Sequence, residues 1–79
     1  MKMQAYAVAS EMLYVALSGI HKTHLMYSCN LSHKMCEKYV KTLLKNGLLK
    51  KREDRFHTTQ KGIQFLETYQ KLECLWDTV

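Results

Sequence analysis

The stretch SHKMCEKYVKTLLKNG, residues 32–47, decides how the rest of the chain is interpreted. Four lysines recur in it, and on a helix that turns about 100° per residue they fall within about 60° of one another. These lysines are Lys34, Lys38, Lys41 and Lys45. The opposite side of the same helix carries Cys36, Tyr39, Val40 and Leu43, with Leu44 at its edge. The stretch therefore predicts an amphipathic helix over residues 33–46, with Ser32 as its N-cap and Gly47 just beyond its C-terminus.

The row of lysines has two interpretations. Like charges in a row repel one another, and a polyanion such as a nucleic-acid backbone relieves that repulsion. Alternatively, the row is a solvated face that only keeps the protein soluble. The chain carries a formal net charge of +5, but the region from Lys22 to Arg55 holds nine cations and three acids, a net charge of +6. This basic centre favours a localised anionic partner.

The length of 79 residues allows one small domain, so residues 1–79 are expected to form a single unit. A core of this size is only marginally stable, and oligomerisation is a common remedy. No apolar run approaches the roughly 20 residues that span a bilayer. The N-terminal residues also lack the pattern of a signal peptide. We therefore expect an intracellular protein, in the cytoplasm or nucleoid, with no membrane partner.

The cysteines do not form a disulfide framework, because their number is odd and no C-x-x-C motif is present. Cys29 and Cys36 are interpreted as small core residues. Cys74 lies near the end of the last predicted helix, where a bridge between two subunits stays an alternative.

The segment before the lysine row predicts two helices. Residues 3–18 are apolar over far more than the roughly 100° stripe that one core needs, which favours contact with a second subunit. The alternative is a central helix buried within its own domain. Residues 23–29 predict a short helix, followed by a turn at Asn30 and Leu31. A short helix, a tight turn and a longer basic helix form a helix-turn-helix pattern.

The segment after Gly47 predicts a β-hairpin and a last helix. Residues 48–51 and 55–58 are compatible with two strands joined by a charged turn, with Phe56 facing inward. Thr59 is placed to cap a helix over residues 60–76, whose broad apolar face predicts a dimer contact. Gly62 lies near the start of that helix, where a missing side chain lets another backbone approach closely.

This order of elements is that of a winged helix-turn-helix. Three pieces of sequence, NLS at 30–32, YVKTLLKNGLL at 39–49 and TQKGIQFL at 59–66, resemble a family of small archaeal winged helix-turn-helix DNA-binding proteins, which also has members in viruses of thermophilic archaea. The resemblance covers about residues 3–72. It implies a mostly helical α+β fold, with a three-helix core and two-stranded wing in residues 3–58 and a C-terminal helix in 59–77 that contacts a partner. Two departures matter: the wing turn is minimal, and the last helix is short compared with relatives that form a long coiled coil.

The resemblance also implies DNA binding through residues 33–46, supported by the wing at residues 50–55. Side chains near the start of such a helix meet base edges, so Lys34 and Lys38 are expected to reach guanine. Glu37 is expected either to accept a hydrogen bond from cytosine or to repel phosphate when the helix lies in a wrong register on the DNA. The face has no arginine, and lysine reads bases poorly, so electrostatics should dominate. The predicted DNA-contacting residues are Ser32, His33, Lys34, Glu37, Lys38, Lys41, Lys45, Lys50, Lys51, Arg52 and Arg55.

The residues expected at the dimer contact are Met3, Ala7, Leu66, Tyr69, Leu72 and Trp76. Thr23 and Ser32, as residues at helix starts, are each interpreted as caps that also present polar groups to phosphate.

Other chemistries find little support in the sequence. The spacing of His21, His24, Cys29, His33 and Cys36 matches no standard zinc pattern, so no metal and no cofactor are expected. No catalytic arrangement or glycine-rich phosphate loop is present, which argues against an enzyme. The aromatic residues do not alternate with cations as a single-strand binding platform would.

The sequence therefore predicts a homodimer that binds double-stranded DNA with some sequence preference, as a transcriptional regulator. Two alternatives stay open: a protein-interaction or assembly module on the same scaffold, and a protein that coats DNA non-specifically.

Overall fold

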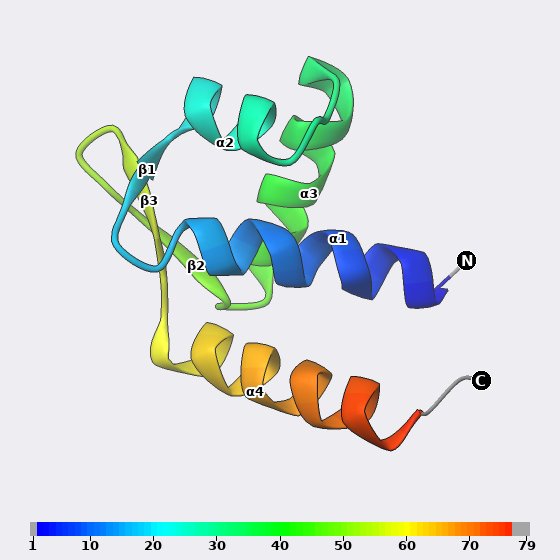
Figure 1. Cartoon of the computed structure of the whole chain (residues 1–79). Helices are drawn as coiled ribbons and strands as arrows, with labels where there is room; N and C mark the ends of the chain where they lie inside the picture. Colours follow the sequence, from blue (N-terminus) through cyan, green and yellow to red (C-terminus); the bar gives the residue numbers. More distant parts are fainter. Residues whose placement is uncertain (1, 77–79) are drawn as a thin grey trace.

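The computed structural model describes residues 2–76, with side chains from residue 4 onward. Its elements are α1 (Lys2–Val15), β1 (Ile20–His21), α2 (Lys22–Ser28), α3 (His33–Lys45), β2 (Leu49–Arg52), β3 (Arg55–Thr58) and α4 (Gln60–Leu75). Figure 1 shows α1 crossing the middle of the molecule, with α2 and α3 on one side of it and α4 on the other. The sheet lies at the C-terminal end of α1, and α4 runs back from it beside α1. This is the predicted α+β fold with a three-helix core, a wing and a C-terminal helix.

The ends of α3 confirm the predicted signals. The Ser32 side chain accepts a hydrogen bond from the Met35 N–H at 3.1 Å, which makes it the N-cap. At the other end Gly47 has a φ of 74°, and its N–H donates to the Leu44 carbonyl at 3.1 Å. The Leu48 N–H donates to the Leu43 carbonyl at 2.9 Å, which completes the glycine-based helix stop.

The turn between α2 and α3 also contains a residue in the left-handed conformation, but that residue is not glycine. Asn30 has a φ of 54°, and its N–H donates to the Tyr27 carbonyl at 3.1 Å. The Leu31 N–H donates to the Met26 carbonyl at 3.0 Å. Asparagine tolerates this left-handed conformation better than most residues, so the predicted turn is confirmed with a physical reason for its sequence.

The start of the chain differs from the prediction in three respects. The first helix ends at Val15 rather than at residue 18, and the chain then turns at Gly19, which has a φ of 95°. The strand β1 was not predicted; it pairs antiparallel with β3, so the sheet has the order β1-β3-β2. Thr23 is not a cap, because α2 begins one residue earlier and His21 occupies the N-cap position without a side-chain bond. The interpretation of Thr23 as a cap is therefore wrong, and its presentation of polar groups to phosphate stays a prediction.

The hairpin is confirmed with a shift in its boundary. Arg52 belongs to β2 and pairs directly with Arg55 of β3, so the turn consists of Glu53 and Asp54 alone. Phe56 is 5% exposed and faces the core, as the alternation predicted. Glu53 has a φ of 59°, a conformation that a non-glycine residue adopts at some cost.

The core lies between α1, α2, α3 and the sheet. Its fully buried residues include Met12, Leu13, Leu25, Cys36 and Leu43. Cys29 is 8% exposed, and burial raises the pKa of its thiol to about 11, so the thiol stays neutral and unreactive near neutral pH. Cys29 and Cys36 are therefore core residues, as predicted, whereas Cys74 is exposed on α4.

One junction joins the end of α3 to the start of α4. The Lys61 ammonium donates to the Asn46 carbonyl at 2.8 Å, and the Thr59 hydroxyl donates to the Gly47 carbonyl at 2.6 Å. The Thr59 N–H donates to the Leu48 carbonyl at 3.0 Å. The Thr59 hydroxyl oxygen also accepts from the Gly62 N–H at 3.0 Å, which confirms it as the α4 N-cap. The backbone carbonyls of the three residues that follow α3 are thus bound by residues at the start of α4.

A second contact holds the end of the wing against α1. The buried Thr58 donates its hydroxyl to the Leu13 carbonyl at 2.6 Å and its N–H to the Ala16 carbonyl at 3.1 Å. These carbonyls lie near the C-terminus of α1, where helices leave acceptors unpaired. The wing, α1 and α4 are therefore held together by hydrogen bonds as well as by packing.

Replacement of Gly62 by alanine tests the junction. Alanine normally favours a helix over glycine by about 1 kcal/mol. Here the added methyl group would collide with the Leu48 carbonyl oxygen and lie 2.6 Å from the Thr58 methyl. We therefore expect Gly62→Ala to destabilise the fold by about 1–3 kcal/mol, measured by urea unfolding.

Gln64→Ala, at an exposed position of the same helix, is the matched control and should be close to neutral or slightly stabilising. An alanine at position 62 that raised the unfolding midpoint would show that the close approach to Leu48 does not exist.

Candidate nucleic-acid interface

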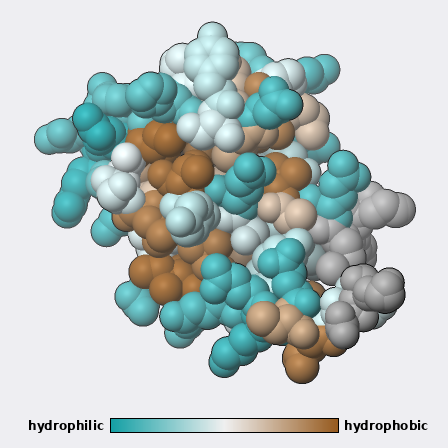
Figure 2. All heavy atoms as spheres, viewed as in Figure 1, coloured by the Kyte–Doolittle hydropathy of each residue, from teal (hydrophilic) through white to brown (hydrophobic). Residues whose placement is uncertain are grey.

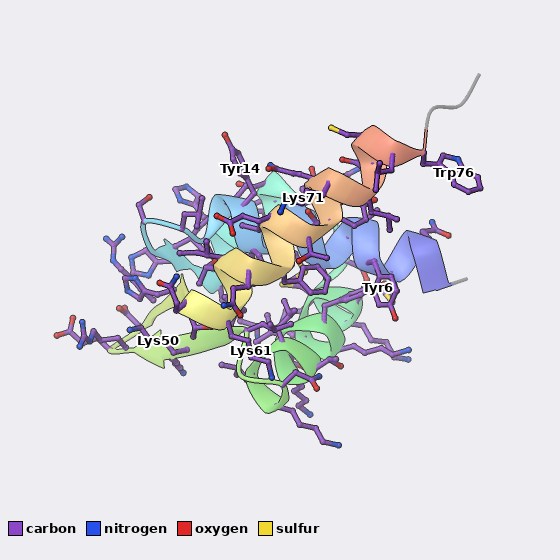
Figure 3. The ribbon with its side chains drawn as sticks, turned by 90° about the horizontal axis from the view of Figure 1, so that it is seen from below. Tyr6, Tyr14, Lys50, Lys61, Lys71 and Trp76 are labelled. Atoms are coloured by element: carbon purple, nitrogen blue, oxygen red, sulfur yellow. The ribbon has the colours of Figure 1, made fainter. Side chains whose placement is uncertain are left out.

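The four lysines of α3 face solvent. Lys34, Lys38, Lys41 and Lys45 are all exposed, while Cys36, Val40 and Leu43 on the opposite side are buried. Within residues 2–76 the ion pairs are Lys22 with Glu37 and His21 with Asp54. None of the four lysines is therefore neutralised by a carboxylate in the part of the chain that the structure describes. Figure 3 shows nitrogen-tipped side chains extending from α3, on the side of the molecule away from Lys71. We call this surface the cationic face.

The pairing of β2 with β3 shows on which side of the sheet each basic residue of the wing lies. Directly paired residues share a side. Lys51 pairs with the inward-facing Phe56, and its ammonium lies 5.9 Å from the centre of that ring. Lys50 and Arg52 therefore lie on the outer side, where Arg52 pairs with Arg55.

The outer side of the sheet carries two residues that the sequence interpretation missed. His57 pairs with Lys50, and His21 of β1 pairs with Arg55, so both imidazoles share the outer side with these cations. The signal that places them is strand alternation, and it is readable only once β1 is known. Like charges at directly opposed positions destabilise a sheet, so the pair of Arg52 and Arg55 favours an anion between them.

The wing turn is attached to β1 through His21. Its Nδ1 atom lies 3.2 Å from the Asp54 carbonyl oxygen and 3.7 Å from an Asp54 carboxylate oxygen. Both groups are well exposed, so the contact contributes little stability. It does position the turn against the first strand, and thereby orients the arginines that flank it.

Glu37 is bound by a residue of the neighbouring helix α2. Its carboxylate accepts a hydrogen bond from the Lys22 ammonium of α2 at 2.8 Å. That hydrogen bond, together with the positive charge of Lys22, lowers the pKa of the Glu37 carboxyl, so it stays ionised at neutral pH. The carboxylate is therefore engaged by its own chain at the edge of the cationic face. Glu37 thus links α2 to α3, and its predicted contact with cytosine or phosphate stays a prediction.

The residues predicted at the dimer contact do not form one patch. Leu66 is 7% exposed and belongs to the core of its own chain, so its assignment to a subunit contact is corrected. The exposed Ala7 lies seven residues before Tyr14, about 20° from it around α1. Figure 3 shows Tyr14 on the side opposite α3. The side chain of Met3 lies outside the described part of the chain.

The remaining predicted residues form an apolar surface with Tyr6, which the prediction did not include. The Tyr6 ring meets Phe65 of α4 edge-to-face, with ring centres 6.2 Å apart. Leu72 is 42% exposed, Trp76 is 72% exposed and Tyr69 is half-buried. Figure 3 shows Tyr6 and Trp76 near the same end of the molecule. We call Tyr6, Tyr69, Leu72 and Trp76 the end surface.

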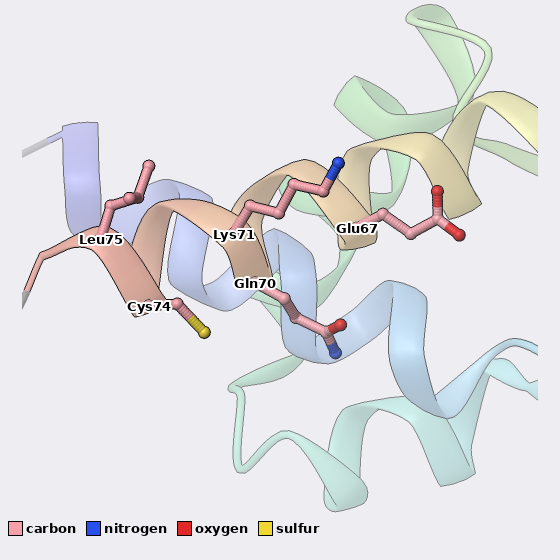
Figure 4. A pocket seen from close by; sticks show the side chains of 5 residues that line it. All are labelled: Glu67, Gln70, Lys71, Cys74 and Leu75. Carbon is pink, nitrogen blue, oxygen red and sulfur yellow. The ribbon is translucent and has the colours of Figure 1, made fainter.

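Other surface features do not add a site. A shallow groove along α4 is lined by Glu67, Gln70, Lys71, Cys74 and Leu75 (Figure 4). Hydrophobic atoms are also exposed where α1 reaches the sheet and at the end of α4 (Figure 2). Within residues 2–76 no three histidine, cysteine or acidic side chains are placed to hold a metal ion. Nor does the described chain include a helix with the length and apolar character that crossing a bilayer requires.

Comparison with known proteins gives two results. The sequence profile of the winged helix-turn-helix family matches residues 2–76. An uncharacterized protein of the archaeon Methanocaldococcus jannaschii is 34% identical over 62 residues, which cover 77% of this chain and 64% of the relative. The chain thus spans less than two thirds of that relative's length. Winged helix-turn-helix domains are typically DNA-binding and not enzymatic.

Replacement of Glu37 by glutamine tests whether its carboxylate contacts DNA. The change removes a negative charge from the cationic face and leaves the Lys22 ammonium without an ionised partner. We expect tighter binding to duplex DNA, with a log–log salt slope steeper by up to about 1, because one more phosphate contact becomes available. Fluorescence anisotropy with a labelled duplex between 50 and 200 mM salt measures both quantities.

Glu67→Gln on α4 changes the net charge equally and should leave the slope unchanged. Weaker binding by the Glu37→Gln variant would show instead that the carboxylate contacts a base.

Proposed function

Because the chain belongs to the winged helix-turn-helix family, we propose that it binds double-stranded DNA as a homodimer and regulates transcription. The observation that carries the proposal is the cationic face of α3, whose four lysines are exposed and have no carboxylate partner within residues 2–76. The apolar side of the same helix is buried in the core. The charges are thus held outward on a rigid element, where they repel one another until an anion is bound.

The shape of α3 fits the major groove. An α-helix with its side chains is about 10–12 Å across, and the groove of B-DNA is about 12 Å wide. His33 and Lys34, in the first turn, are then nearest to base edges, while Lys41 and Lys45 further along meet phosphates. Lysine binds phosphate as a point charge, so a large part of the affinity is independent of sequence.

The wing supplies a second contact beside α3. Lys50, Arg52 and Arg55 share its outer side. A phosphate between the two paired arginines relieves their mutual repulsion, since both guanidinium groups donate to one anion. The two-residue turn limits how far the wing extends, so phosphate binding is favoured over deep insertion into a minor groove.

The end surface is the contact that suits a dimer on one duplex. A pair formed through the side that carries Tyr14 would direct its two α3 helices away from each other. A two-fold axis through the end surface instead keeps both cationic faces on the same side. Two such helices would meet successive major grooves about 34 Å apart.

Charge reversal on α3 tests DNA binding. Lys34→Glu with Lys38→Glu should abolish duplex binding without changing the oligomeric state, because both positions are exposed and neither belongs to the end surface. If each subunit neutralises about four phosphates, the wild-type log–log salt slope should be near −7. Anisotropy titrations at several salt concentrations measure the affinity of each variant for the duplex and the salt slope of the wild type.

The single Lys34→Glu change should already weaken duplex binding. Lys71→Glu, on the opposite side of the molecule, changes the net charge equally and should alter affinity little. A slope flatter than about −3 contradicts the proposed mode. Reversal that spares duplex binding but disrupts binding to another protein would favour the assembly-module alternative.

A charge in the end surface tests the dimer. Leu72→Glu should produce a monomer in sedimentation equilibrium and weaken duplex binding, since the two half-sites are then bound independently. Tyr14→Glu is the matched control: Tyr14 is 63% exposed and lies on α1 away from the end surface. Dissociation by Tyr14→Glu rather than by Leu72→Glu would contradict the proposed arrangement.

A further inference from the structure

Met35 is an apolar side chain held in water at the start of the cationic face. It lies in the first turn of α3 and is 40% exposed. Its N–H donates to the Ser32 hydroxyl oxygen at 3.1 Å, so the N-cap fixes its backbone. An exposed methionine adds nothing to solubility, and apolar area left in water is unfavourable. We therefore ask whether Met35 is exposed because it contacts the ligand of α3.

Met35 begins an apolar edge beside the row of lysines. Lys38 and Thr42 follow it by three and seven residues, so all three lie within about 60° on α3. The Thr42 hydroxyl donates to the Lys38 carbonyl at 3.1 Å, which directs the hydroxyl to its own helix. Thr42 is exposed, so its methyl group remains available on the same edge as Met35.

The opposite edge of α3 is not equivalent. Leu44 is 36% exposed and lies nine residues after Met35, about 180° around the helix. Glu37 lies on the same side as Leu44 and is bound by Lys22 of α2 at 2.8 Å. That edge therefore faces α2, whereas the Met35 edge faces away from it.

A helix in the major groove brings the side chains of its N-terminal turn, Met35 among them, to the base edges on the groove floor. The apolar group that base edges display there is the 5-methyl group of thymine. Methionine is flexible and polarizable, so it adapts to such a contact without exact placement. The lysines of α3 favour phosphate and guanine, and they leave A·T pairs to be read by another side chain.

We propose that Met35, with the Thr42 methyl group two turns further along the same edge, contacts thymine 5-methyl groups in the major groove and thereby determines part of the sequence preference. The inference rests on the proposed binding of duplex DNA. Burial of one methyl group corresponds to about a fourfold change in affinity, so the effect is measurable at each contacted thymine.

The experiment compares two forms of one probe, a duplex selected from a random pool by the wild-type protein and the same duplex with every thymine replaced by deoxyuridine. The wild type should bind the uracil form at least about fourfold more weakly. Met35→Ala should lose most of this discrimination, while Met35→Leu, which keeps an apolar side chain, should retain it. Leu44→Ala, on the opposite edge of α3, should discriminate like the wild type. Circular dichroism melting checks that each variant is folded.

Equal binding of the two duplexes by the wild type would overturn this inference and leave the proposed function intact. So would a Met35→Ala variant that discriminates as strongly as the wild type. A wild-type protein that binds no duplex at low salt would overturn the proposed function and this inference together.

Discussion

The position of α3 depends on the three carbonyls that follow it. Asn46, Gly47 and Leu48 each accept a hydrogen bond from Thr59 or Lys61, so the end of the basic helix is bound to the beginning of α4. The base of the wing lies between these two segments, and it can neither lengthen nor twist without breaking those bonds. The absence of a side chain at Gly62 permits the approach, because a methyl group there would meet the Leu48 carbonyl. One junction thus sets the angle between α3, the wing and the C-terminal helix.

The electrostatics of the surface follow from this scaffold. Burial of Cys36, Val40 and Leu43 directs the lysines outward, and the β2–β3 register places Arg52 opposite Arg55 on one side of the wing. The acid within α3, Glu37, is bound by Lys22 and so does not neutralise the row of lysines. Positive charge is therefore held at two neighbouring places by packing and by hydrogen bonds. A polyanion that contacts both relieves the repulsion at both.

The elements that the sequence predicted well depend on local signals. The face of α3, its cap at Ser32, its stop at Gly47 and the hairpin all follow from spacing over a few residues. The features that it missed depend on distant pairing. A strand of two residues, Ile20–His21, has no periodicity of its own and exists because β3 pairs with it. The Lys22–Glu37 bond joins residues fifteen apart and requires the packing of α2 against α3. Leu66 and Leu72 both lie on the apolar side of α4, and only the position of α1 decides that Leu66 is buried.

The central claim is that the cationic face of α3, with the outer side of the wing beside it, is the surface that meets duplex DNA. Nuclear magnetic resonance titration of the labelled protein with a duplex tests this most directly, because it maps the contact without any substitution. We expect the amide shift changes to concentrate in residues 32–45 and 50–55, with smaller changes in the helix-turn-helix turn. Changes centred on the groove of Gln70 and Cys74, with α3 unaffected, would contradict it.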